Sequence, residues 1–214
     1  MKDQLCAICG VEKATTVDHI PPKGIFPKPR PANLITVPSC IRCNNTASKD
    51  DEAFRVFLSL HVGIESPQTQ ALWEKEAFRS TRHNRRLFNY ITQTAKKVVL
   101  QTKAGIILGT RMAVRWDSNV HDRTIERIIR GLYFHHFGEI LGNRVTIRVH
   151  WLRSLTEDIF EMSKEWKQGN LGENAFIYRY DRTEDGPLHS IWLFQFYDKH
   201  LASGYTTPTP LTLP

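Results

Sequence analysis

The sequence predicts an α+β protein in two parts: a cysteine-stapled module over residues 1–50, and a domain of helices and antiparallel strands over residues 51–214. Three observations support this prediction. All four cysteines lie in the first part, as two Cys-x-x-Cys pairs. The first part has the order strand, loop, strand, helix. The second part mixes helix-like and strand-like segments, which is typical of an α+β architecture.

The composition indicates a folded chain with a basic charge balance. Hydrophobic residues make up 41% and charged residues 24%, so wholesale disorder is excluded. The net charge of +7 favours a polyanionic partner, with nucleic acid first. A basic soluble enzyme without such a partner is the other interpretation of this charge.

The compartment follows from the same sequence. No apolar run approaches the roughly 18–20 residues that a membrane span needs, and the start MKDQLCAICG lacks the apolar run of a signal peptide. We therefore expect a cytoplasmic protein that does not enter a membrane. In a reducing compartment, paired Cys-x-x-Cys motifs indicate metal ligands rather than disulfides.

The local structure of the first part is predicted from its apolar runs and its prolines. Residues 15–20 and 34–37 are strand candidates, and the proline-rich segment 21–33 between them is a loop. Pro38 and Ser39 then open a predicted helix that runs through Cys43 and Asn44.

The four cysteines predict a structural zinc site. Each pair places two thiolates on one metal from a tight turn, and two pairs complete a closed tetrahedral set; the ligands are Cys6, Cys9, Cys40 and Cys43. A closed set leaves no position for water, so this zinc is expected to hold the module together rather than to react. A redox pair is the alternative, but it needs only one Cys-x-x-Cys.

Asp18 and His19 form the chemical candidate of the module. Strand alternation points them to opposite faces, and two adjacent polar side chains in an apolar strand need partners. A histidine near its ordinary pKa can take a proton from water at neutral pH. A carboxylate can hold a divalent cation that stabilises a leaving oxygen.

These residues together resemble a known family. Cys-x-x-Cys, Asp-His-Ile-Pro-Pro, Asn-Leu and Cys-x-x-Cys-Asn, in this order over residues 4–50, are similar to the zinc-bound branch of the HNH endonucleases. The resemblance implies a ββα-metal (His-Me finger) module. Because asparagine stands at the third motif position, where many members have histidine, this chain would be an HNN variant.

The resemblance also implies a role for each matched residue. His19 would be the general base, and Asp18 and Asn44 would hold a catalytic Mg²⁺ or Mn²⁺. Asn33 would orient the histidine. The implied activity is endonucleolytic hydrolysis of DNA. The stretch from Asn33 to Cys40 is longer than in the family pattern, and Asn45 competes with Asn44 for the third position.

The second part contains a long predicted helix and a basic stripe. Residues 68–99 have apolar residues at helical spacing, so one helix is expected there. Three arginines on one face of it, followed by two lysines, are candidate nucleic-acid contacts: Arg79, Arg82, Arg86, Lys96 and Lys97. The alternative is a solvated helix face. A second candidate stripe, diluted by acidic neighbours, consists of Arg123, Arg127 and Arg130.

Further segments complete the expectation for the second part. Strands are predicted near residues 106–116, 145–151, 174–181 and 191–198, helices near 122–137 and 155–166, and an extended or disordered tail from Thr206. None of these segments carries a motif that names a substrate. They are expected to select the target or to mediate self-association, so a homodimer is possible.

Two functional alternatives remain at this point. A non-catalytic zinc module that binds nucleic acid needs the cysteines and the basic stripe, but neither Asp18 nor His19. An RNA-directed nuclease of a toxin or defence system needs the same site as a DNA nuclease. Only the family resemblance favours DNA over RNA as the substrate.

Overall fold

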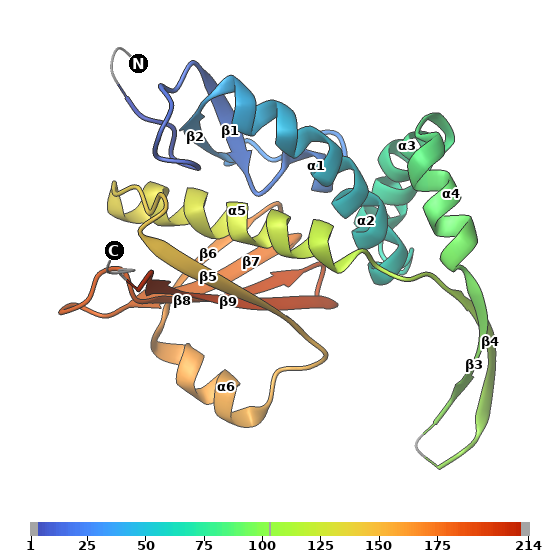
Figure 1. Cartoon of the computed structure of the whole chain (residues 1–214). Coiled ribbons are helices and arrows are strands. Elements are labelled where there is room, and N and C mark those ends of the chain that lie inside the picture. The colour runs from blue at the N-terminus through green and yellow to red at the C-terminus, as the bar shows by residue number, and fades with distance from the viewer. Residues whose placement is uncertain (1–3, 103, 211–214) are drawn as a thin grey trace.

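The computed structural model describes residues 4–102 and 104–210, which form a mixed α+β structure in three layers (Figure 1). Helix α5 (Ser118–Phe137) lies in the middle. On one side it contacts the N-terminal strand pair and helix α1 (Ile41–Val62), and on the other a five-stranded sheet. The predicted α+β class is therefore confirmed.

The two strands predicted for the N-terminal part are present, and they pair with each other. Strand β1 (Thr16–Ile20) runs antiparallel to β2 (Ile35–Ser39), with Asp18 opposite Val37. The prediction that Pro38 opens the helix is wrong, because Pro38 pairs with Val17 inside β2. Among the described strands, β2 pairs only with β1, and an edge strand tolerates a residue without an N–H.

Helix α1 extends far beyond the helix predicted from Pro38 and Ser39 through Asn44. It runs for 22 residues through position 50 and contains no glycine or proline that would break it. The expected division at residue 50 therefore falls inside a helix. The main hydrophobic core also contains residues from both predicted parts, since it includes Ile20 of the first and Trp192 of the second.

The segment predicted as one helix over residues 68–99 is interrupted, so that prediction is wrong. It consists of α2 (Pro67–Ala71), a π-helical turn (Leu72–Ala77), α3 (Phe78–His83), α4 (Arg85–Thr94) and strand β3 (Lys96–Gln101). The side chain of Asn84 accepts a hydrogen bond from the N–H of Leu87 at 3.0 Å and so starts a new helix. After Thr94 the β-branched Val98 and Val99 pair with strand β4 (Ile107–Ala113).

The remaining strands form one antiparallel sheet in the order β5-β9-β8-β7-β6. Its strands are β5 (Val145–Leu152), β6 (Lys167–Leu171), β7 (Phe176–Arg182), β8 (Ser190–Phe196) and β9 (His200–Pro208). Helix α6 (Glu157–Met162) lies on the side of the sheet away from α5 (Figure 1). The tail predicted as extended or disordered continues β9 to Pro208, and its residues 211–214 lie outside the described part.

A glycine lets α5 approach β1 closely. A Cβ atom added to Gly131 would lie 2.4 Å from Cγ1 of Ile20, a distance that real carbon atoms do not adopt. Only glycine therefore fits this crossing. One turn earlier on the same helix, Arg127 faces the same strand.

None of the helices in the described ranges combines the length and the apolar character that a passage through a bilayer requires.

Two buried histidines face each other where α5 meets β9. Nε2 of His121 and Nε2 of His200 are 3.1 Å apart, and both side chains are almost fully buried. One ring must donate and the other accept, which requires at least one neutral imidazole. Burial lowers the pKa of His121, and burial together with the neighbouring His121 and His61 lowers that of His200 to about 2.

This pair predicts a loss of stability in acid. The unfolded chain takes up protons below a histidine pKa of about 6.5, while the folded His200 does not, so stability is full above this pH and falls below it. The slope is about 1.4 kcal/mol per pH unit for each such histidine. Urea unfolding of His200→Gln between pH 7.5 and 5 should show a slope smaller by about one proton. The exposed-histidine control His150→Gln should keep the wild-type slope, and equal slopes in both variants would contradict the prediction.

Candidate functional site

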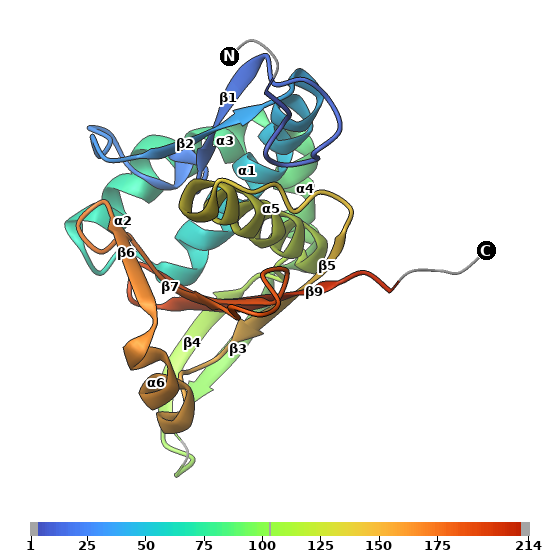
Figure 2. The same cartoon turned by 90° about the vertical axis from the view of Figure 1, so that its left-hand side faces the viewer.

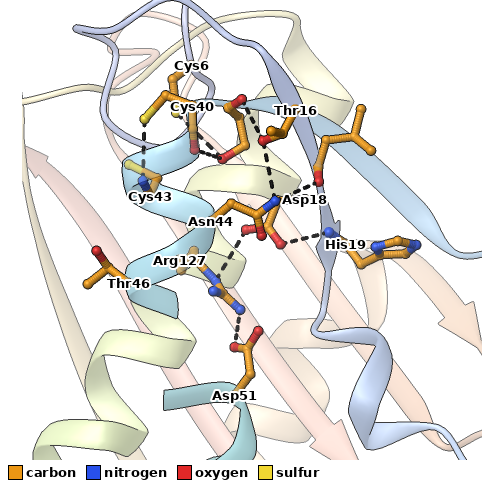
Figure 3. A network of polar contacts seen from close by, with 12 residues as sticks. Cys6, Thr16, Asp18, His19, Cys40, Cys43, Asn44, Thr46, Asp51 and Arg127 are labelled. Carbon is orange, nitrogen blue, oxygen red and sulfur yellow. Dashed lines mark hydrogen bonds and ion pairs between the residues drawn. The ribbon is translucent and has the colours of Figure 1, made fainter. Parts of the chain in front are cut away.

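The four cysteines come together where the β1–β2 hairpin meets α1. Figure 3 shows Cys6, Cys40 and Cys43. Cys6 and Cys9 precede β1, Cys40 caps α1, and Cys43 lies in the first turn of that helix. Their Sγ atoms all lie within 4.8 Å of one another. The N–H of Cys43 points at Sγ of Cys40 at 3.4 Å, as expected when a helix start approaches a thiolate.

This cluster fits a tetrahedral metal ion such as zinc. A Zn–S bond of about 2.3 Å places neighbouring sulfurs about 3.8 Å apart, which the observed separations allow. Burial raises the pKa of Cys9, but hydrogen bonds from the backbone N–H groups of Glu12 and Val11 outweigh it and lower this pKa to about 7. All four side chains are free thiols, so no disulfide competes for them.

Asp18 and His19 point to opposite sides of β1, as strand alternation predicts. Asp18 faces inward and only 5% of it is exposed, whereas His19 is partly exposed. The backbone N–H of His19 donates to Oδ1 of Asp18 at 2.9 Å. Burial, followed by the charge of Lys23, lowers the pKa of His19; Asp18 raises it and Arg30 lowers it further.

Arg127 of α5 reaches into the space beside Asp18. Its Nε lies 3.6 Å from Oδ2 of Asp18, and its Nη2 donates to Asp51 of α1 (Figure 3). The Arg127 side chain is 9% exposed, so a buried guanidinium stands between two carboxylates. Among the described residues, Oδ2 of Asp18 and Nε of Arg127 have no hydrogen-bond partner.

The protonation of the two carboxyl groups reflects this burial. Burial raises the pKa of Asp18, while Arg127 and the N–H of His19 act in the opposite direction. Burial likewise raises the pKa of Asp51 to about 6, with Arg127 lowering it and Asp18 raising it. The guanidinium of Arg127 places a positive charge between the two carboxyl groups.

Asn44 joins this group from the first turn of α1. Its side-chain amide donates to Oγ1 of Thr16 and to the carbonyl of Val17, both at 3.3 Å. Its oxygen takes part in no hydrogen bond among the described residues. The competing Asn45 is exposed, so of the two asparagines it is Asn44 that lies against β1 beside Asp18.

Asn33 does not join the group. Its side-chain amide donates to the carbonyl of Asn170 in β6 at 3.3 Å, and no hydrogen bond in the described ranges connects it with His19. The residue opposite His19 across the hairpin is Thr36. The structure therefore brings together three of the four residues that the sequence proposes for catalysis, and the role of Asn33 remains a prediction.

The five basic candidates of the second part are all exposed. Arg79 and Arg82 lie on α3 and Arg86 on α4, with the break at Asn84 between them. The single helical face predicted for the three arginines is therefore wrong. Lys96 and Lys97 lie on β3.

The arginines of the second stripe, Arg123, Arg127 and Arg130, form ion pairs with nearby acidic residues. Arg123 makes two hydrogen bonds of 2.7 and 2.8 Å to Asp50, Arg130 binds Glu126 at 2.8 Å, and Arg127 is buried as described. A cavity of about 320 Å³ between α1 and α5 is lined by these arginines and by Cys43.

Sequence reasoning missed the roles of Arg127 and Asp51. A signal existed, because Arg127 lies among Ile125, Ile128 and Ile129. An arginine within such an apolar run is buried only with an acidic partner.

Comparison of the chain with protein-family models, with curated proteins and with solved structures finds no match in any of the three.

The cysteine cluster predicts one bound zinc ion per chain that the fold requires. Cys40→Ala should lose zinc on dialysis and unfold at a much lower temperature, because zinc binding by such sites contributes on the order of 10 kcal/mol to folding. Elemental analysis and thermal unfolding measure both effects. The control Val37→Ala should lose about 2 kcal/mol of stability yet keep its zinc. A Cys40→Ala protein with undiminished zinc would contradict the site.

Proposed function

We propose that this protein is a zinc-stabilised nuclease of the HNH type that hydrolyses phosphodiester bonds in DNA. The observation that carries the proposal is the arrangement of Asp18, His19 and Asn44. Adjacent residues of β1 and the first turn of α1 contribute them, next to a cysteine cluster that fits zinc. A hairpin followed by a helix is the arrangement that the sequence resemblance implies.

His19 is the proposed general base. It lies on the open side of β1, where substrate can reach it, and its lowered pKa keeps it neutral at pH 7. Lys23 and Arg30 act on it as nearby positive charges, and Nε of Arg30 donates to the carbonyl of Lys23 at 3.1 Å. The same charges favour a phosphate beside the imidazole.

The proposed reaction is an in-line hydrolysis. His19 accepts a proton from water, and the water oxygen forms a bond to phosphorus while the bond from phosphorus to the 3′ oxygen breaks. The products are a 5′ phosphate and a 3′ hydroxyl, whose proton comes from solvent. His19 then returns its proton to solvent.

The site fits a divalent cation in the chemistry of its donors. Among the described residues, Oδ2 of the buried Asp18 lacks a hydrogen-bond partner, and no hydrogen bond uses the oxygen of Asn44. The positive charge of Arg127 beside Asp18 opposes cation binding. Mg²⁺ or Mn²⁺ bound by Asp18 and Asn44 would stabilise negative charge on the leaving oxygen. Arg127 has to release Asp18 for this to happen.

The burial of Asp18 also favours a second function. If the contact of Arg127 with Asp18 and Asp51 is permanent, the module is a scaffold that binds nucleic acid without cutting it. That protein would hold one zinc ion and would lack activity dependent on a divalent cation.

Replacement of His19 separates the two functions. With Mg²⁺ or Mn²⁺, wild-type protein should nick plasmid DNA, and His19→Ala should be slower by at least about 100-fold, the usual contribution of a general base. Gel assays on plasmid, linear DNA and RNA measure this, with zinc content and thermal stability expected to be unchanged. The control His150→Ala replaces an exposed histidine of β5 and should cleave normally. Equal cleavage by His19→Ala would refute the mechanism, and wild-type protein that binds but never cuts would favour the scaffold.

A further inference from the structure

The positive charge of this chain is concentrated in one segment. Residues 77–116 contain nine of the 29 lysines and arginines and none of the 22 aspartates and glutamates. Since the whole chain carries +7, the remaining residues are slightly acidic. A patch of one sign on an otherwise balanced protein is the electrostatic pattern of a polyanion-binding surface.

The described cations of this segment are free to meet a ligand. All eight are exposed, and none forms an ion pair with another described residue; they are Arg79, Arg82, Arg85, Arg86, Lys96, Lys97, Arg111 and Arg115. Arg123 and Arg130, by contrast, are held by acidic neighbours.

The C-terminal half of the segment contains a two-stranded ribbon, formed by β3 and β4, that projects from the rest of the protein (Figure 1). Within the described ranges, strands β3 and β4 pair only with each other, so neither outer edge pairs with another described strand. Figures 1 and 2 show the ribbon projecting away from the three layers. Its large apolar side chains are 40–69% exposed: Val99, Leu100, Ile106, Ile107, Leu108 and Met112. An isolated ribbon of this kind is marginally stable in water, so contact with a partner would stabilise it.

Shape and charge select duplex DNA as that partner. The major groove of B-form DNA, about 12 Å wide, accepts a two-stranded β-ribbon, and apolar side chains there contact thymine methyl groups. The major groove of A-form RNA is too narrow for this. A second copy of this chain would bring a ribbon of the same charge, which like-charge repulsion disfavours.

We propose that the β3–β4 ribbon enters the major groove of duplex DNA, while the exposed arginines of α3 and α4 contact the adjoining phosphates. The ribbon is thus a DNA-binding arm separate from the Asp18–His19 site. This inference deepens the proposed function by naming the form of the substrate, and its bearing on cleavage rests on that function.

Fluorescence anisotropy with a labelled duplex of about 25 base pairs, long enough for two turns of groove, tests the arm without added divalent cations. The variant Lys96→Ala/Lys97→Ala/Arg111→Ala should bind at least about 10-fold more weakly, and the slope of log K against log salt should fall by about 2–3. The control Arg148→Ala/Arg153→Ala/Lys164→Ala removes three exposed cations outside the segment and should bind within about 2-fold of wild type. A duplex RNA of the same sequence should bind more weakly than the DNA.

Two outcomes would overturn the proposal that the ribbon binds DNA. One is an equal loss of DNA binding in the two triple variants, or none in either. The other outcome concerns the oligomeric state in sedimentation velocity. If wild type is a dimer, and Ile107→Ser/Leu108→Ser is a monomer that binds DNA as well as wild type does, the ribbon binds a second copy of the chain instead of DNA.

The inference and the proposed function fail separately. If wild-type protein binds duplex DNA through the ribbon but does not cut it, the DNA-binding role of the ribbon is supported and the nuclease activity is refuted. If ribbon variants cleave DNA with an unchanged KM, the proposed DNA-binding role of the ribbon is refuted and the proposed nuclease activity is retained.

Discussion

The ion pair of Arg127 with Asp18 and Asp51 is the contact on which the arrangement of this molecule depends. It connects the central helix α5 with β1 and α1, at the level where Gly131 lets helix and strand approach closely. All three charges are largely withdrawn from water, so each is stable only with the others present. Removal of one partner from such a group costs about 3–5 kcal/mol, because it leaves an uncompensated buried charge.

The cysteine cluster, which could hold a metal ion such as zinc, and the ion pair constrain the β1–β2 hairpin in different ways. The cysteines connect the segment before β1 to the start of α1, and this connection needs no contact with α5. The ion pair instead attaches the hairpin to the rest of the fold through Asp18, the residue that a catalytic cation would also need. In the proposed nuclease, Arg127 therefore competes with the cation for Asp18.

The sequence predicted what depends on local pattern and composition. The hairpin strands, the cysteine cluster, and the opposite orientation of Asp18 and His19 follow from spacing and alternation. The break at Asn84 escaped prediction, because the apolar periodicity continues across it and only the capping of Leu87 decides the outcome. Neither the partner of Asn33 in β6 nor that of Asp18 in α5 could be predicted, since both contacts join residues more than 100 positions apart.

The response of stability to Mn²⁺ in an Arg127→Met variant tests the competition most directly. Without Mn²⁺ the variant should be about 3–5 kcal/mol less stable than wild type, and saturating Mn²⁺ should return about 2–3 kcal/mol of this, whereas wild type should respond little. The control Arg123→Met removes the exposed partner of Asp50 and should behave like wild type. Adding Asp18→Asn to Arg127→Met should abolish the response to Mn²⁺. Equal stabilisation of wild type and Arg127→Met by Mn²⁺, or of neither, would contradict the assignment of Arg127 as the competitor of a catalytic cation.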